Sequence, residues 1–176
     1  KRARKARSAN TISFQEWLSH LVNNDKLTGL PDFESFKLKV AEAVPLAPKQ
    51  NYAIVYADIL NFKYFNYVFG YKAGDTLLVA LAKAIQKDKA NLHACRMFSD
   101  NFVYLRSIES PKQAAMETVK FYKNFANEQN HNFVGSNLLL SCGIYPLGNQ
   151  HLNVAEAVDK SNIARKLYPE NNVQVK

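Results

Sequence analysis

One stretch of the chain constrains the fold more than any other, the apolar run YAIVYADI at residues 52–59. Its β-branched and aromatic residues predict a buried central strand. The strand ends in a carboxylate, Asp58, which is costly to bury unless it is paired or bound to a cation, and hard divalent cations prefer such oxygen ligands. The pattern therefore indicates either a magnesium-nucleotide site or a simple helix cap at Asp58, and it leaves both open.

The rest of the chain alternates between helical periodicity and short apolar runs. We expect helices at residues 11–23, 32–44, 61–69, 73–87, 111–130 and 153–167, and further strands at 92–97, 102–106, 138–145 and 173–175. Pro45 and Pro48 are expected to end the second helix. From the central strand onward the order is β-α-α-β-β-α-β-α-β, with a hairpin at residues 98–101. This order predicts an α+β fold, a mainly antiparallel sheet flanked by helices.

Charge is distributed unevenly along the chain. The formal net charge is +8, but five of the 23 basic residues lie in the first seven positions, which leaves 18 basic against 15 acidic residues elsewhere. This distribution argues against a nucleic-acid-binding face. It predicts a basic lead-in helix or linker at residues 1–23, followed by one domain at 24–176. The stripe of Phe14, Trp17 and Leu21 on the lead-in helix would either pack within the chain or form a homodimer.

Cysteine, histidine and hydropathy patterns exclude several classes of protein. Two cysteines cannot form a disulfide framework, and the four histidines lack the spacing of a zinc site. No apolar stretch approaches the roughly 18–20 residues that span a bilayer. These patterns predict a cytoplasmic domain, either free or as the cytoplasmic part of a membrane-anchored protein.

Three motifs together resemble the GGDEF domain, the family of bacterial diguanylate cyclases. They are DKLTGLP at residues 25–31, the run at 58–75, and Arg-x-x-x-Asp-x-Phe at 96–102. They occur in the family's order and spacing, and the resemblance covers about residues 24–175. It implies a palm-like central sheet, related to nucleotide cyclases. Two such domains, each with one GTP, would face each other to make cyclic di-GMP.

The resemblance also implies a role for each matching residue. Asp58, through its carboxylate, and Ile59, through its carbonyl, would bind metal together with Asp100, which would also be the catalytic carboxylate. Two groups of residues would bind the nucleotide: Lys63 and Lys166 at the phosphates, Asn66 and Asp75 at the guanine. Magnesium is the expected cofactor where a nucleotide is bound, and no cofactor is expected otherwise.

The signature loop departs from the family's pattern. It reads Phe98-Ser99-Asp100-Asn101-Phe102, so three of five positions have changed. In the family the first two are glycines, which let the backbone approach the phosphates closely, whereas a phenylalanine ring would crowd them. Further departures fall at Leu60, Tyr67, Tyr71 and Glu170, and at residues 89–92, where an Arg-x-x-Asp product-inhibition motif is missing.

The retained residues favour holding a nucleotide, whereas the changed residues affect the geometry of the reaction. The sequence therefore predicts a catalytically inactive regulatory or GTP-sensing module in cyclic di-GMP signalling, in which Asp100 is vestigial. Its expected partners are GTP and other signalling domains of a longer chain, such as a sensor or an EAL-type phosphodiesterase. Two alternatives stay open: a weakly active diguanylate cyclase that uses two GTP, and a ligand-free dimerisation or structural module.

Overall fold

The computed structural model describes residues 24–47, 49–148, 153–167 and 174–175. The expected lead-in helix with its Phe14, Trp17 and Leu21 stripe lies outside these residues, as does Glu170. The elements in chain order are α2 (Phe33–Leu46), β1 (Asn51–Ile59), α3 (Phe62–Phe69), α4 (Tyr71–Lys87), β2 (Asn91–Phe98), β3 (Asn101–Ile108), α5 (Pro111–Asn132), β4 (Leu140–Pro146), α6 (Val154–Leu167) and β5 (Gln174–Val175). This succession confirms the predicted α+β fold and its element order.

The sheet has the strand order β2-β3-β1-β4-β5, with β1 at its centre. Strand β1 is antiparallel to both β3 and β4, and β2 is antiparallel to β3. The short β5 pairs in parallel with β4. The sheet is therefore mainly antiparallel, as predicted.

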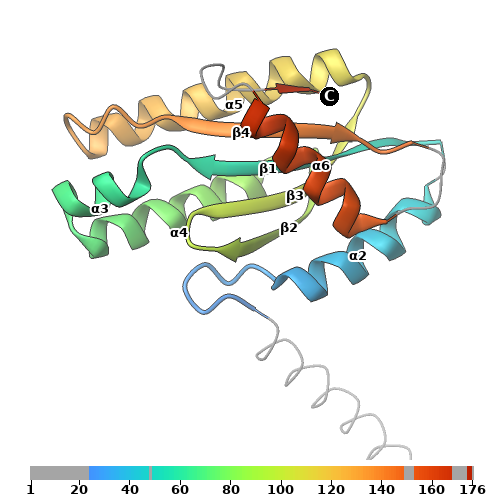
Figure 1. Cartoon of the computed structure of the whole chain (residues 1–176), viewed down its shortest axis with the longest axis horizontal. Coiled ribbons are helices and arrows are strands. Elements are labelled where there is room, and N and C mark those ends of the chain that lie inside the picture. Colours follow the sequence, from blue (N-terminus) through green and yellow to red (C-terminus); the bar gives the residue numbers. More distant parts are fainter. Residues whose placement is uncertain (1–23, 48, 149–152, 168–173, 176) are drawn as a thin grey trace, which may run out of the picture.

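Helices cover both faces of the sheet, which explains why β1 is an almost continuous apolar run. Alternate residues of β1 point to opposite faces. Tyr52, Ile54 and Tyr56 pack in a core with α2 and α6. Ala53 and Val55 pack in a second core with α4 and α5. Figure 1 shows α6 crossing one face of the sheet, over the strands at its centre.

Helices α2 and α4 each differ from the prediction at one end. Helix α2 continues through Pro45 to Leu46, because a proline in the last turn removes only one hydrogen bond of the helix. Helix α4 begins at Tyr71 and not at Ala73, since Gly70, with φ 86°, is its N-cap. Gly74 therefore lies inside the first turn of α4, where a Cβ atom would overlap the Asn66 side chain of α3.

The predicted hairpin is present, with Ser99 and Asp100 at its tip. Ser99 adopts the left-handed conformation, with φ 51°. The Arg96 side chain stabilises this turn because its Nε donates to the Ser99 carbonyl at 2.7 Å. Its Nη1 also lies 3.1 Å from both carboxylate oxygens of Asp25, which ties the turn at residues 25–31 to the hairpin.

Gly143 of β4 determines how closely α6 approaches the sheet. A Cβ atom at this position would overlap the backbone oxygen of Ser161 and would crowd the backbone nitrogen of Arg165. Only a glycine allows this approach, so Gly143 fixes the position of Arg165 relative to β1 and β4. Within the part of the chain that the structure describes, no helix is both long enough and apolar enough to cross a membrane.

We expect Gly143→Ala to lower the free energy of unfolding by about 1–3 kcal/mol, because the added methyl group pushes α6 away from the sheet. Urea unfolding measures this change. Gly148→Ala is the matched control, since no heavy atom lies within 4 Å of the added methyl group there. Its effect should stay within about 1 kcal/mol. Equal effects of the two substitutions would show that α6 does not depend on Gly143.

Candidate functional site

The structure brings together the two carboxylates that the sequence placed in one site. Asp58 lies at the end of β1, on the face of the sheet that α6 covers, and its side chain is within hydrogen-bonding reach of Asp100. Asp100 lies at the hairpin tip and is only 9% exposed. Its Oδ2 accepts a hydrogen bond from the backbone N–H of Ile59 at 3.2 Å. The end of β1 and the tip of the hairpin therefore form one cluster.

The same cluster contains Arg165 of α6, which the sequence did not predict as a site residue. Its Nη1 donates to Oδ2 of Asp58 at 2.6 Å. Its Nε and Nη2 donate to Oδ1 of Asn162 at 3.1 Å and 2.9 Å. The guanidinium carbon also lies 5.3 Å from the ring centroid of Tyr56, a distance at which cation–π attraction contributes. Arg165 is thus held from three sides.

Asn101 has a structural role, whereas the sequence indicated only that it replaces a carboxylate of the family. Its Oδ1 accepts a hydrogen bond from the Tyr56 hydroxyl at 2.9 Å, and its Nδ2 donates to the Phe98 carbonyl at 3.3 Å. These bonds link the base of the hairpin to the ring on which Arg165 rests. A carboxylate at position 101 would instead place another negative charge beside Asp100.

Burial raises the pKa of Asp58 to about 6, and the hydrogen bond with Asp100 and its charge act in the same direction. Arg165 and Lys166 oppose this shift. A short ion pair with Arg165 alone would lower the pKa of Asp58. The ion pair and the raised pKa therefore point in opposite directions. The raised pKa is consistent with the composition of the cluster, because one guanidinium cannot balance two adjacent carboxylates that are partly removed from water.

The signature loop places its aromatic residues differently. Phe102 is fully buried in the core, whereas the Phe98 side chain is 62% exposed. The Phe98 ring is therefore mostly in contact with solvent, and the crowding expected for a bound nucleotide stays a prediction.

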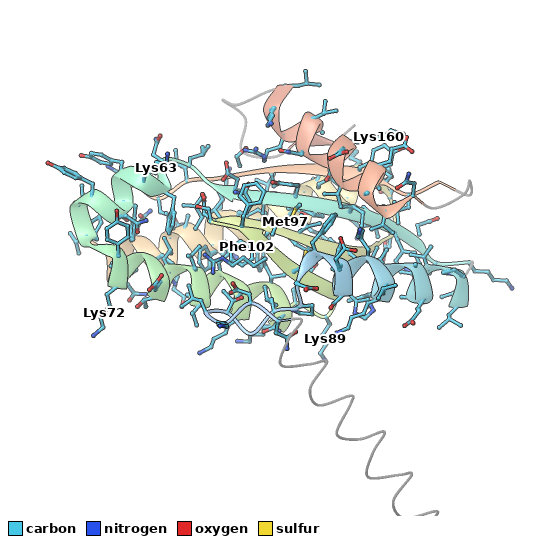
Figure 2. The ribbon with its side chains drawn as sticks, turned by 60° about the horizontal axis from the view of Figure 1, so that its bottom comes forward. Lys63, Lys72, Lys89, Met97, Phe102 and Lys160 are labelled. Carbon is cyan, nitrogen blue, oxygen red and sulfur yellow. The ribbon has the colours of Figure 1, made fainter. Side chains whose placement is uncertain are left out.

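The basic residues predicted to contact phosphate lie on two different helices. Lys63 is exposed in the first turn of α3 (Figure 2). Lys166 is exposed on α6, directly after Arg165, and its charge acts on Asp58. Both amino groups are therefore accessible to an anionic ligand.

The predicted guanine-binding residues lie where α3 and α4 meet. The Oδ1 atom of Asn66 is buried against Gly74 and has no hydrogen-bond partner among the described residues. A buried acceptor without a partner costs free energy, and a donor on a ligand would remove that cost. Asp75 is exposed and follows Gly74 directly, in the turn of α4 that packs on Asn66. This corner therefore holds one exposed acceptor, at Asp75, and one buried acceptor, at Asn66, which a ligand could reach only if the amide turned away from Gly74.

The described residues do not fit a divalent cation at Asp58 as they are arranged. One of the two carboxylate oxygens of Asp58, Oδ2, already binds a guanidinium. Among the described residues, no group of three or more histidine, cysteine, aspartate or glutamate side chains could hold a metal ion. The site expected at Asp58, Ile59 and Asp100 thus has its carboxylates in place, but a positive side chain already binds one oxygen of Asp58.

Comparisons with known proteins agree with this fold. The family model "Diguanylate cyclase, GGDEF domain" matches residues 22–169. The chain is 32% identical to the cyclic di-GMP phosphodiesterase PdeR of Escherichia coli over 109 residues, which are 60% of this chain and 16% of PdeR. It is 28% identical to a diguanylate cyclase of Vibrio cholerae over 160 residues, 87% of this chain and 48% of that protein. It thus spans less than half the length of each.

Among solved structures, the coiled coil and GGDEF domain of DgcB from Caulobacter crescentus, in complex with c-di-GMP, is similar in fold. The TM-score is 0.76 and the identity 17%, and the match covers 99% of this chain and 98% of that one. At this identity the likeness supports the fold alone.

The pKa of Asp58 is measurable by following its carboxyl carbon by NMR as pH changes. We expect a midpoint near 6. Asp100→Asn should lower this midpoint, because it removes the neighbouring negative charge. Since the pKa in the folded protein lies above the ordinary value of 3.8, Asp58 should make folding less favourable as pH rises from about 4 to 6. A midpoint below about 4 would contradict this account.

Proposed function

The chain belongs to the GGDEF domain family of diguanylate cyclases, and from this membership we propose that it acts in cyclic di-GMP signalling as a regulatory domain. In this proposal the domain holds a guanine nucleotide but does not convert it. The observation that carries the proposal is the buried Oδ1 atom of Asn66, an acceptor without a partner among the described residues.

Recognition of guanine follows from the chemistry of the α3–α4 corner. The guanine base presents an N1–H and a 2-amino group, both hydrogen-bond donors, on one edge. Asn66 Oδ1 and the Asp75 carboxylate are both acceptors, so they match this edge and not that of adenine. Lys63 and Lys166 are exposed and are free to contact the phosphates.

The proposed absence of turnover rests on the signature loop and on the carboxylate at the end of β1. Phe98 and Ser99 replace the glycines that would let the backbone approach the phosphates, and Asn101 replaces a carboxylate. In addition, Asp58 is bound to Arg165. A displacement near 1 Å at reacting atoms can lower a rate by about 100-fold, so these changes together favour binding over reaction.

The partners that we propose are neighbouring signalling domains in a longer chain. The relative named cyclic di-GMP phosphodiesterase, PdeR, matches this chain over only 16% of its own length. A sensor or an EAL-type phosphodiesterase attached to this domain would receive the signal of nucleotide binding, in the cytoplasm. Magnesium as a companion of the nucleotide stays a prediction, and so does a homodimer.

We expect GTP at millimolar concentration to raise the melting temperature of the domain, because a ligand at 100 times its Kd stabilises a protein by about 2.7 kcal/mol. Asn66→Ala should abolish the shift, and ATP should produce a smaller one. Asn124→Ala, at an exposed position of α5, is the matched control. Absence of any shift would favour the ligand-free structural module. Formation of cyclic di-GMP, assayed by chromatography, would favour the weak cyclase.

The double substitution Phe98→Gly and Ser99→Gly should strengthen GTP binding in a calorimetric titration. It removes the ring that we expect to crowd the phosphates, and glycine adopts the left-handed conformation of residue 99 without strain. The single variant Ser99→Gly separates the effect of the turn from that of the ring. An unchanged affinity of the double variant would show that Phe98 is not the obstruction.

A further inference from the structure

We propose that the Arg165 guanidinium is a built-in replacement for the divalent cation at Asp58 and Asp100, so that this domain binds no metal there. The part of the inference that concerns nucleotide binding without magnesium rests on the proposed function. The part that concerns the metal does not, because it follows from the protein's own residues.

The contacts of Arg165 hold its charged group in a single place. Its Nη1 lies 2.6 Å from Asp58 Oδ2, and Asn162 accepts from both Nε and Nη2. The Tyr56 ring lies 5.3 Å from the guanidinium carbon. The side chain is only 13% exposed and that of Asp58 20%, so salt and water screen this ion pair less than one on the open surface.

The backbone is arranged to bring Arg165 to this position. Gly143 lets α6 lie so close to β4 that a methyl group at residue 143 would crowd the backbone nitrogen of Arg165. On the other side, Asn101 holds the hydroxyl of Tyr56 and thereby orients the ring under the guanidinium. A residue of the altered signature loop therefore supports the position of the cation.

Electrostatic repulsion argues against a metal ion at Asp58. Two cationic side chains, Arg165 and Lys166, already act on this carboxylate. A divalent cation bound to Asp58 would lie within a few ångströms of the guanidinium, and like charges at that distance repel strongly. A metal ion that used Asp58 Oδ2 would have to displace the guanidinium from this atom.

The consequence for a nucleotide is that protein side chains neutralise its phosphates. Arg165 has N–H groups beyond those that bind Asp58 and Asn162, since a guanidinium carries five. Lys166 and Lys63 add flexible amino groups that are exposed. GTP should therefore raise the melting temperature equally in magnesium and in EDTA.

The test is a titration of the chain with Mn²⁺ alone. Electron paramagnetic resonance measures binding as a decrease in the signal of the free ion. We expect no specific binding by the wild type up to about 1 mM. Arg165→Gln should bind Mn²⁺ at least ~10-fold more tightly. Lys160→Gln, on the same helix (Figure 2), removes the same charge and makes no contact with Asp58, so it should behave like the wild type.

Two results would overturn the inference. One is stoichiometric Mn²⁺ binding by the wild type that Asp58→Asn abolishes, because Arg165 would then support a metal site. The other is a folded Arg165→Gln that binds Mn²⁺ no better than Lys160→Gln. If Arg165→Gln does not fold, the wild-type titration decides whether this site binds a metal. Arg165→Lys keeps the positive charge and should also bind no Mn²⁺.

The two proposals fail in different ways. If GTP stabilises the chain only in magnesium, metal-free binding is wrong while the proposed function stands. If GTP produces no shift in either buffer, the proposed function is wrong, and the Mn²⁺ titration still judges the role of Arg165 because it contains no nucleotide.

Discussion

The ion pair between Asp58 and Arg165 is the interaction on which the rest of the site depends. It joins the end of the central strand to the last helix, across 107 positions of sequence. Its partners on either side, Asp100 and Tyr56, belong to the hairpin tip and to β1. Because the charges are partly buried, separating them would leave an uncompensated charge near the core, which is strongly unfavourable. The ion pair therefore occupies one oxygen of Asp58 and also helps to position α6.

The two ends of the site differ in how ready they are for a ligand. At the α3–α4 corner, Asn66 Oδ1 is buried and unpaired among the described residues. At the end of β1, Asp58 already has a cation as its partner. Binding energy is therefore available where a base would be recognised, whereas the carboxylates that would promote reaction are already engaged. This division is the basis of our proposal that the domain senses a nucleotide without consuming it.

Much of the fold was predictable from sequence because its signals are local. The apolar run of β1, the hairpin around Ser99 and Asp100, and the order of elements follow from periodicity and turn chemistry. The meeting of Asp58 and Asp100 followed only from the family resemblance. Arg165 escaped prediction because its contact depends on how closely α6 approaches Gly143, a tertiary distance that no local pattern encodes. Likewise, the sequence showed Asn101 only as the replacement of a carboxylate, and its hydrogen bond with the Tyr56 hydroxyl is visible only in the structure.

Crystals grown with GTP and Mn²⁺ would test the central claim most directly, because anomalous scattering locates manganese without ambiguity. We expect Arg165 still to bind Asp58 in these crystals, with no manganese peak between Asp58 and Asp100. A peak bridging these two carboxylates, with the guanidinium displaced from Asp58, would contradict it.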